Sequence, residues 1–256
     1  MDESVKNNLS EKLNIRYKGR LGQIPIFFGK QIRMFIYQSD WITIPMAVLI
    51  AGLVSLALGK NFGTTKEGTL MGIFALVCVS LWNGTFNSIQ IICRERDVIK
   101  REHRSGMHIS SYIIAHMLYQ AIICLIQCTV TLITCHIVGM RFKGEGLFTP
   151  WLVVDIGISL FLATYAADML ALFISSVVRS TTIAMTVMPF VLILQMVFSG
   201  GLFPLPGSIS FITKVTISSP GFDSMASLMD VGNLQYKSIN DMFNAINSTE
   251  MDVTFK

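Results

Sequence analysis

The chain has 256 residues, of which 52% are hydrophobic and only 14% are charged, and its formal net charge is +4. An ordinary soluble domain carries about 25% charged residues, so this composition argues against a soluble globular protein. We therefore expect an integral membrane protein with several spans.

The first 40 residues are predicted to form a cytoplasmic lead that ends in an amphipathic helix. Apolar side chains between Ile24 and Ile36 alternate with Lys30 and Arg33, a pattern typical of a helix that lies in the lipid headgroup region. The first long apolar stretch begins only at Trp41, so the pattern of a secretory signal peptide is not met. We expect this helix to act as an interfacial elbow before the first span.

Five stretches are long and apolar enough to cross a bilayer, for which about 20 residues are needed. They are Trp41 to Gly59, Thr69 to Cys93, Tyr112 to Gly139, Pro150 to Val178 and Thr181 to Phe203. The predicted fold class is therefore an all-α integral membrane protein. We expect a polytopic helical bundle whose transmembrane domain covers residues 41–203.

The second span carries a stripe of polar side chains, all within about an 80° arc at 100° per residue. The stripe consists of Ser80, Asn83, Asn87 and Gln90. Lipid cannot satisfy these groups, and unpaired polar groups in hydrocarbon cost several kcal/mol. The stripe therefore either forms hydrogen bonds to other helices or lines a cavity that contacts a translocated molecule, and the residues alone favour neither reading.

Residues 94–108, which follow the second span, contain eight formally charged side chains and two histidines. A charged side chain costs a few kcal/mol at the bilayer centre, so this segment must lie outside the lipid. Loops on its side of the membrane hold thirteen Lys and Arg residues and loops on the other side hold seven, which places the N-terminus and this segment in the cytoplasm. The charges alone suit a topology signal, contact with anionic lipid or docking to a partner.

Small side chains recur every four residues in the fourth span, a spacing that lets helix backbones approach closely. They are Ser159, Ala163, Ala167, Ala171 and Ser175. Asp168 lies near the middle of this span, where a carboxylate serves as a proton relay or substrate contact, or is hydrogen-bonded at a helix interface. Asp155 is nearer the end of the span and is expected to be hydrated.

Three of the five cysteines, Cys124, Cys128 and Cys135, fall on one face of the third span beside His136. Cysteine and histidine can bind metal, but their spacing here is not that of a metal site. We therefore expect these side chains to pack against other helices, and we predict no metal site.

The fifth span contains Pro189, which removes a backbone hydrogen bond and kinks a helix. The span ends near the pair Gly200 and Gly201, which gives the backbone conformational freedom. The semi-apolar run from Ile209 to Ile217 is too short to span. We therefore predict a bendable outer end, followed by an external re-entrant segment and a polar tail over residues 204–256.

Two blocks of sequence resemble the same family. The first block reads E-R-x-x-x-x-R-E, then G-M and S-x-Y, and consists of Glu95, Arg96, Arg101, Glu102, Gly106, Met107, Ser111 and Tyr112. The second block consists of Phe198, Ser199, Gly200, Pro204, Pro206, Ser219 and Pro220. Over residues 25 to 235, their order and spacing resemble the permease domain of ABC transporters of the ABCG (White-like) type, a branch of the type-2 ABC permeases.

The resemblance implies a coupling segment over residues 94–110, a cavity and a gate. The residues that contact an ATP-binding domain would be Glu95, Arg96, Arg101, Glu102, Gly106 and Met107. A central cavity between two paired permeases would be lined by Asn83, Phe86, Asn87, Met188, Leu192 and Met196. An upper gate would be formed by Gly200, Gly201 and Leu202.

The resemblance also implies an ATP-driven exporter of a hydrophobic or amphipathic substrate in the cell membrane. The sequence contains no G-x-x-x-x-G-K-[ST] phosphate loop, so this chain alone is not expected to be an enzyme. ATP and Mg would be bound by a nucleotide-binding domain on another chain or on a missing portion. The expected partners are that domain, a second permease copy and membrane lipids, and no nucleic acid.

The family has six spans, and we expect the sixth to be missing from this chain. Two other function classes stay open at this point. An ion-coupled or proton-coupled secondary transporter would use Asp168, and a non-transporting membrane assembly subunit would need neither the polar stripe nor a kinked gate.

Overall fold

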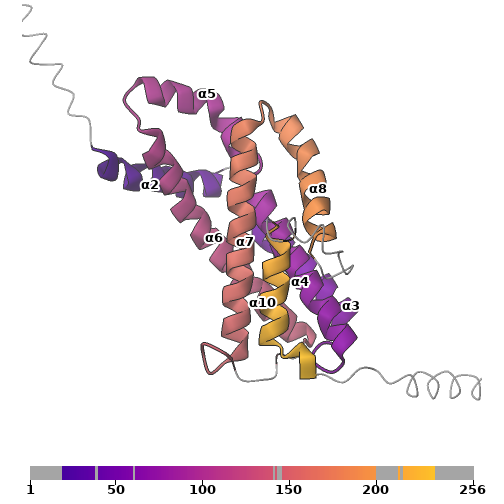
Figure 1. Ribbon diagram of the computed structural model, residues 1–256. Helices are drawn as coiled ribbons and strands as arrows, with labels where there is room; N and C mark the ends of the chain where they lie inside the picture. Colours follow the sequence, from indigo (N-terminus) through magenta and orange to yellow (C-terminus); the bar gives the residue numbers. More distant parts are fainter. Residues whose placement is uncertain are drawn as a thin grey trace, which may run out of the picture. The chain divides into compact units, whose positions relative to one another are not determined.

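The computed structural model describes residues 19–37, 40–59, 61–140, 142, 146–199, 213 and 216–233. Within these residues the secondary structure is helical, without strands, which confirms the all-α prediction (Figure 1). The α-helices are α2 (Arg20–Tyr37), α3 (Thr43–Leu58), α4 (Lys66–Ser88), α5 (Ile91–Arg104), α6 (Ile109–Val138), α7 (Leu152–Val177), α8 (Thr181–Val197) and α10 (Ser218–Leu228). Short 3-10 helices cover Asp40–Ile42 and Val231–Asn233.

Four of the described segments are long and apolar enough to cross a membrane, and they coincide with the first four predicted spans. They are Asp40–Leu58, Lys66–Arg104, Ile109–Val138 and Leu152–Val177. Helix α8, in the fifth predicted span, has 17 residues, at the lower end of the range of about 17–25 for a spanning helix. Residues 200–203 of that span and residues 204–212 of the predicted re-entrant segment lie outside the described residues.

Local signals account for several helix ends. The Thr65 hydroxyl accepts a hydrogen bond from the Gly68 N–H at 3.3 Å before α4. The Ser180 hydroxyl accepts one from the Ile183 N–H at 3.3 Å before α8. Such N-caps satisfy backbone donors that the first turn of a helix leaves without an internal partner.

The described chain divides into two compact units. The smaller unit comprises α2, residues 95–104 of α5 and residues 109–119 of α6. The larger unit comprises the other helices, the start of α5 and residues 120–138 of α6. Each unit has its own packing.

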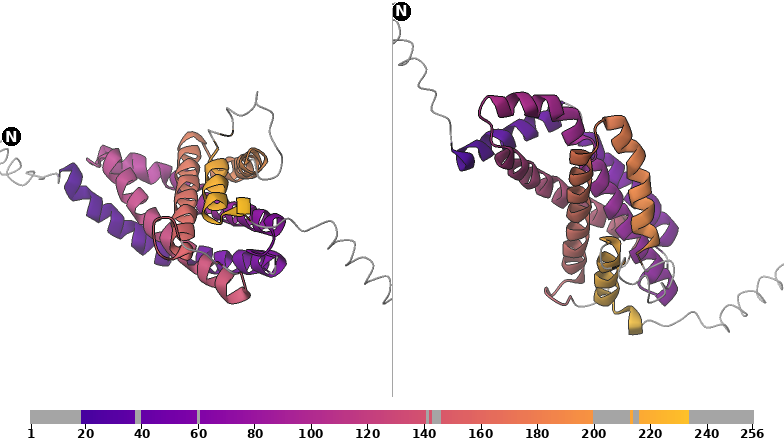
Figure 2. Two further views of the ribbon diagram at one scale, coloured as in Figure 1. Left: turned by 60° about the horizontal axis from the view of Figure 1, so that its bottom comes forward. Right: turned by 45° about the horizontal axis from the view of Figure 1, so that its top comes forward.

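Helices α4 and α7 form the central pair of the larger unit, with α10 packed against both and α3 beside α4 (Figures 1 and 2). A Cβ at Gly84 would lie 2.1 Å from the Thr164 carbonyl oxygen and 3.0 Å from the Ala167 Cβ, so the two backbones nearly touch there. The small side chains of α7 from Ala163 to Ser175 are buried, as the predicted packing stripe requires.

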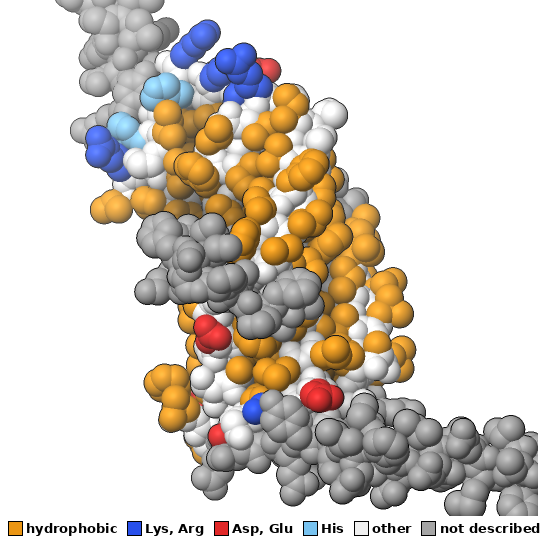
Figure 3. Space-filling model, turned by 45° about the vertical axis from the view of Figure 1, so that its right-hand side comes forward, with side chains coloured by type: hydrophobic (Ala, Val, Ile, Leu, Met, Phe, Trp, Pro, Cys, Tyr) orange, Lys and Arg blue, Asp and Glu red, His pale blue; other side chains and the backbone are white. Residues whose placement is uncertain are grey.

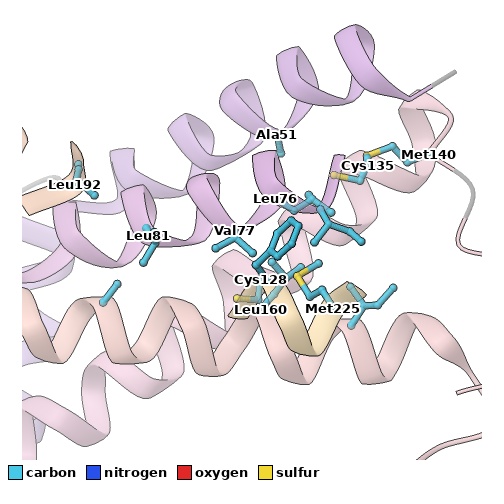
Figure 4. Packing of buried hydrophobic residues seen from close by; sticks show 14 of the residues in the cluster. Ala51, Leu76, Val77, Leu81, Cys128, Cys135, Met140, Leu160, Leu192 and Met225 are labelled. Carbon is cyan, nitrogen blue, oxygen red and sulfur yellow. The ribbon is translucent and has the colours of Figure 1, made fainter. Parts of the chain in front are cut away.

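The hydrophobic core of the larger unit draws on α3, α4, α6, α7, α8 and α10 (Figure 4). Cys128 and Cys135 belong to this core, and Cys124 is buried as well. The cysteine-bearing face of α6 is therefore a packing surface. On the outside, hydrophobic side chains cover most of the middle of the face shown in Figure 3, as contact with lipid requires.

The prediction that Asp155 is hydrated is wrong. Asp155 is only 1% exposed, and its Oδ2 atom accepts a hydrogen bond from the Phe148 N–H at 2.8 Å. The Oδ1 atom accepts another from the Thr149 hydroxyl at 2.9 Å. The loop before α7 folds back over the first turn of the helix, so backbone and hydroxyl donors replace the expected water.

In the smaller unit, α2 buries polar side chains and exposes apolar ones. Gln23 and Gln31 are buried, whereas Ile26, Ile32 and Ile36 are exposed. The exposed apolar side chains can contact lipid, which fits the predicted interfacial elbow helix. Gln23 and Gln31 are buried inside the smaller unit, which also contains residues 95–108 of the charged segment.

Candidate functional site

The start of the charged segment is fixed to the end of α7 within the larger unit. The Cys93 N–H donates to the Ser175 hydroxyl at 3.2 Å, and the Cys93 thiol donates to the Ser175 carbonyl at 3.0 Å. Next to it, the Arg94 guanidinium lies 3.5 Å from the Asp40 carboxylate, just before α3. Three helix ends therefore meet where α5 begins.

Glu95 is the most deeply buried of the six predicted coupling residues. Glu95 is 5% exposed, and its Oε2 atom accepts a hydrogen bond from the Tyr112 hydroxyl at 2.9 Å. The Phe27 ring of α2 packs edge-on against Tyr112 with ring centroids 6.0 Å apart. Burying a carboxylate is costly unless it is hydrogen-bonded, so Glu95 and Tyr112 join α5 to α6 in the smaller unit.

Glu102 joins α5 to α2 through a salt bridge. Its Oε1 atom lies 2.8 Å from the Lys30 Nζ, and both side chains are about 30% exposed. Partial exposure weakens such a pair, because water screens both charges. The contact contributes more to the register between α2 and α5 than to stability.

The turn between α5 and α6 is held by α2. Gly106 has a φ of +102°, in the left-handed region that glycine adopts without steric cost. The Gln23 side chain donates to the Gly106 carbonyl at 3.2 Å and accepts from the His108 N–H at 3.0 Å. The neighbouring Met107 is 6% exposed. The Gln23 side chain and the buried Met107 side chain therefore hold this turn in place.

Another hydrogen bond joins α2 to the start of α6, just after the turn. The buried Ser111 hydroxyl donates to the Arg20 carbonyl at 2.8 Å. Together with the two hydrogen bonds of Gln23 and the salt bridge of Lys30, it gives α2 four polar contacts with residues 102–111. We name Gln23, Lys30, Glu95, Glu102, Tyr112 and Ser111 the clamp.

The two predicted coupling arginines are more exposed than Glu95. Arg101 is exposed and Arg96 is half-buried. Lys100, His103 and Arg104 are exposed as well. The segment thus has an inner side held by α2 and α6 and an outer side rich in positive charge.

Sequence reasoning missed Gln23 and gave Lys30 no partner. The only signal for Gln23 was an amide among the apolar residues of an otherwise lipid-facing helix. Its partners are 83 and 85 residues away in the chain, so spacing alone does not reveal them.

The polar stripe on α4 forms hydrogen bonds to α6 at one of its predicted members. The Asn87 and Gln127 amides exchange two hydrogen bonds, at 2.8 and 3.0 Å. Ser80 instead donates to the Leu76 carbonyl of its own helix at 3.0 Å. The helix-to-helix reading of the stripe therefore holds for Asn87 within this chain.

Asp168 belongs to a second interhelical network that the sequence did not predict. The Gln120 amide donates to the Ser88 hydroxyl at 2.7 Å and to the Asp168 Oδ1 at 3.1 Å. All three residues are buried, and Asp168 has no exposed surface. The carboxylate thus lies at the junction of α4, α6 and α7.

The six predicted cavity residues differ in exposure. Phe86 is 41% exposed and stacks on Trp82, which is 44% exposed, with ring centroids 5.4 Å apart. Asn83, Met188 and Leu192 are buried, and the last two belong to the hydrophobic core. Asn87 and Met196 are half-buried. Phe86 is the member of this set that one copy of the chain leaves most exposed, together with its neighbour Trp82.

The predicted gate cannot be placed, because Gly200, Gly201 and Leu202 lie outside the described residues. Among the described residues, the Gln195 side chain accepts a hydrogen bond from the Ile217 N–H at 2.8 Å. The end of α8 is therefore tied to the start of α10.

Comparison with known proteins agrees with the resemblance seen in the sequence. The family described as ABC-2 type transporter matches residues 26–229. The chain is 29% identical over 182 residues to "ABC transporter G family member 4" of Arabidopsis thaliana, an alignment that covers 66% of this chain and 31% of that protein. It is 26% identical over 159 residues to "ABC transporter ATP-binding/permease protein Rv1747" of Mycobacterium tuberculosis, covering 59% of this chain and 18% of that protein. The chain thus spans less than a third of the length of either relative.

Proposed function

Because this chain belongs to the ABC-2 type transporter family and is a membrane permease component of an ABC transporter, we propose that it moves a hydrophobic or amphipathic substrate outward when an ATP-binding domain drives it. The predicted resemblance to the ABCG type is confirmed by the same comparisons. ATP and Mg would be bound by that domain, supplied by another chain or by a further portion of a longer protein.

The clamp is the observation that carries the coupling proposal. Its inner side is fixed by the Glu95 to Tyr112 hydrogen bond, the Lys30 to Glu102 salt bridge and the Gln23 contacts with the turn. A segment held by these contacts would transmit a displacement caused by a partner to α2 and α6. A solvated loop would instead change its own conformation. The exposed basic side, with Arg101, is the surface that we assign to the ATP-binding domain, since mixed or complementary charges fix docking register.

The translocation path would lie between two copies of the permease. The exposed aromatic pair Trp82 and Phe86 on α4 supports this, because it offers an apolar surface that one copy leaves uncovered. On the same helix, Asn83 is buried and the half-buried Asn87 amide pairs with Gln127, so the exposed surface is formed by the aromatic side chains. An exposed apolar surface of this kind suits the apolar part of a hydrophobic or amphipathic substrate.

The surroundings of Asp168 speak against the rival proton-coupled mechanism. A proton relay needs a path to water, whereas the Asp168 carboxylate has no exposed surface and accepts from Gln120. We assign it a structural role at the junction of α4, α6 and α7.

Coupling is tested by co-expressing the permease with candidate ATP-binding partners and measuring ATPase activity and export in proteoliposomes. We expect Arg101→Ala to lower substrate-stimulated ATPase activity and export while assembly of the permease is preserved. Lys66→Ala, a basic residue at the start of α4 and outside the clamp, is the matched control. Unchanged ATPase activity and export in Arg101→Ala would contradict the assignment.

A further inference from the structure

An apolar groove runs along the larger unit between the second half of α6 and the first half of α7. Its volume is about 570 Å³, within the range of about 300–1,000 Å³ for small-molecule sites. Seven side chains from Leu125 to Ile137 line it on α6, and five residues from Val153 to Phe161 line it on α7. Gly157 lets the two walls approach closely, because a Cβ there would lie 3.0 Å from the Leu132 Cδ1.

The groove opens sideways toward the bilayer. Ile133 is 53% exposed and Ile158 is 46% exposed on its two walls. Both helices are long and apolar enough to span a membrane. The inner end is closed where the helices touch, with the Cys128 Sγ 3.4 Å from the Thr164 Oγ1. Hydrocarbon, and not water, therefore fills the open side.

The length of the groove matches one leaflet. Residues 125–137 extend over about 18 Å at 1.5 Å per residue, and half of a hydrocarbon core about 30 Å thick is about 15 Å. These residues form the part of α6 that is distant in sequence from the charged segment at its start, and they end at the helix terminus, Val138. The groove therefore matches the leaflet that contains the C-terminal end of α6.

One end of the groove has the chemistry of the headgroup level. His136 lines the groove two residues before α6 ends, and it is exposed. Trp151, directly before α7, is 71% exposed, and tryptophan gathers at membrane interfaces. An imidazole N–H at this depth can donate to an ester or phosphate oxygen, while the rest of the groove offers hydrocarbon contacts.

We propose that this groove binds one acyl chain of a phospholipid, with the chain along α6 and α7 and the headgroup beside His136. A spanning helix of another subunit fits less well, because a helix with its side chains is about 10–12 Å wide and the groove is a recess between two helices that already touch at Thr164. The site does not depend on the proposed transport mechanism.

Photocrosslinking tests the site directly. The permease is reconstituted in phosphatidylcholine vesicles containing a trace of phosphatidylcholine with a diazirine on its acyl chain, and labelled peptides are mapped by mass spectrometry. We expect labelling of residues 125–137 and 153–161 to exceed that of the other exposed spans severalfold. Uniform labelling of all exposed spans would overturn the proposal, since it would show only the ordinary lipid annulus.

Two tryptophan variants give the matched comparison. Ile133→Trp fills the groove from its exposed wall and should lower labelling of the groove about tenfold, as expected for a weakened binding site. Ile122→Trp places the same side chain on α6 outside the groove, where the native residue is 49% exposed, and should leave labelling unchanged. Equal labelling in both variants, or disulfide crosslinks between two copies through Ile133→Cys, would reject a lipid in the groove.

Discussion

The Tyr112 hydroxyl of α6 donates a 2.9 Å hydrogen bond to the buried Glu95 carboxylate of α5, across the turn that joins the two helices. The other carboxylate oxygen, Oε1, is buried and has no hydrogen-bond partner among the described residues. The Tyr112 hydroxyl is thus the donor that compensates the burial of this charge. Seventeen residues apart in sequence, the two side chains connect the charged segment to a membrane span.

We predict that Tyr112→Phe destabilises the protein, because it leaves the Glu95 carboxylate buried without its donor. An unsatisfied buried group costs about 1–3 kcal/mol, and more when it is charged. Thermal unfolding in detergent should show a lower midpoint. The double variant Tyr112→Phe with Glu95→Met should recover part of the loss, since the charge is removed as well; a purely additive double variant would show that the two residues do not interact.

The Lys30 to Glu102 pair should affect coupling more than stability. Both side chains are about 30% exposed, and exposed ion pairs contribute only about 0.2–1 kcal/mol. We expect Lys30→Glu to lower export with a nearly unchanged unfolding midpoint, because like charges would push α2 and α5 out of register.

The charge-swapped double variant Lys30→Glu with Glu102→Lys provides the control for this pair. It should restore export, which is measured with the ATP-binding partner in proteoliposomes. If the swap fails to restore export while each single variant is impaired, the two residues act separately and the clamp interpretation of this pair is wrong.

The role of Asp168 separates the permease from a proton-driven transporter. Asp168→Asn keeps a carbonyl oxygen that can accept from Gln120, so the network at α4, α6 and α7 should survive and export should change little. Gln120→Leu removes the donor and leaves the Asp168 carboxylate without that partner, which should cost about 1–3 kcal/mol of stability. Loss of export in Asp168→Asn, with normal folding, would instead favour the proton-coupled mechanism.

The first four spans and the helical fold were predictable from the sequence because composition and stretch length decide them. The stripe of small residues on α7 was also predictable, since its four-residue period is visible in the sequence and its members from Ala163 to Ser175 are buried. Both features depend on residues close together in the chain. They therefore needed no knowledge of tertiary contacts.

The polar contacts of the candidate site were not predictable in the same way. Gln23 bonds to residues 83 and 85 positions away, and Gln120 bonds to Asp168 across 48 positions. Nothing in the spacing of such residues reveals which helix faces them. The error at Asp155 has the same origin, because its position near a span end suggested water while the loop at Phe148 supplies the donors. The coupling and cavity roles of individual residues stay predictions.

The closest approach of α4 and α7 gives the last prediction. A Cβ at Gly84 would lie 2.1 Å from the Thr164 carbonyl oxygen, which is backbone and cannot rotate away, so even Gly84→Ala must push the helices apart. Overpacking of this kind costs about 1–3 kcal/mol, and it would strain the buried network around Asp168, whose N atom lies 3.0 Å from the same Cβ position. We expect a lower unfolding midpoint and reduced export. Gly52→Ala on α3 is the matched control, because the nearest atom to its Cβ is the Thr134 Cγ2 at 3.8 Å, an ordinary contact. If Gly84→Ala is as stable as Gly52→Ala, the two backbones are not held in close contact at this point.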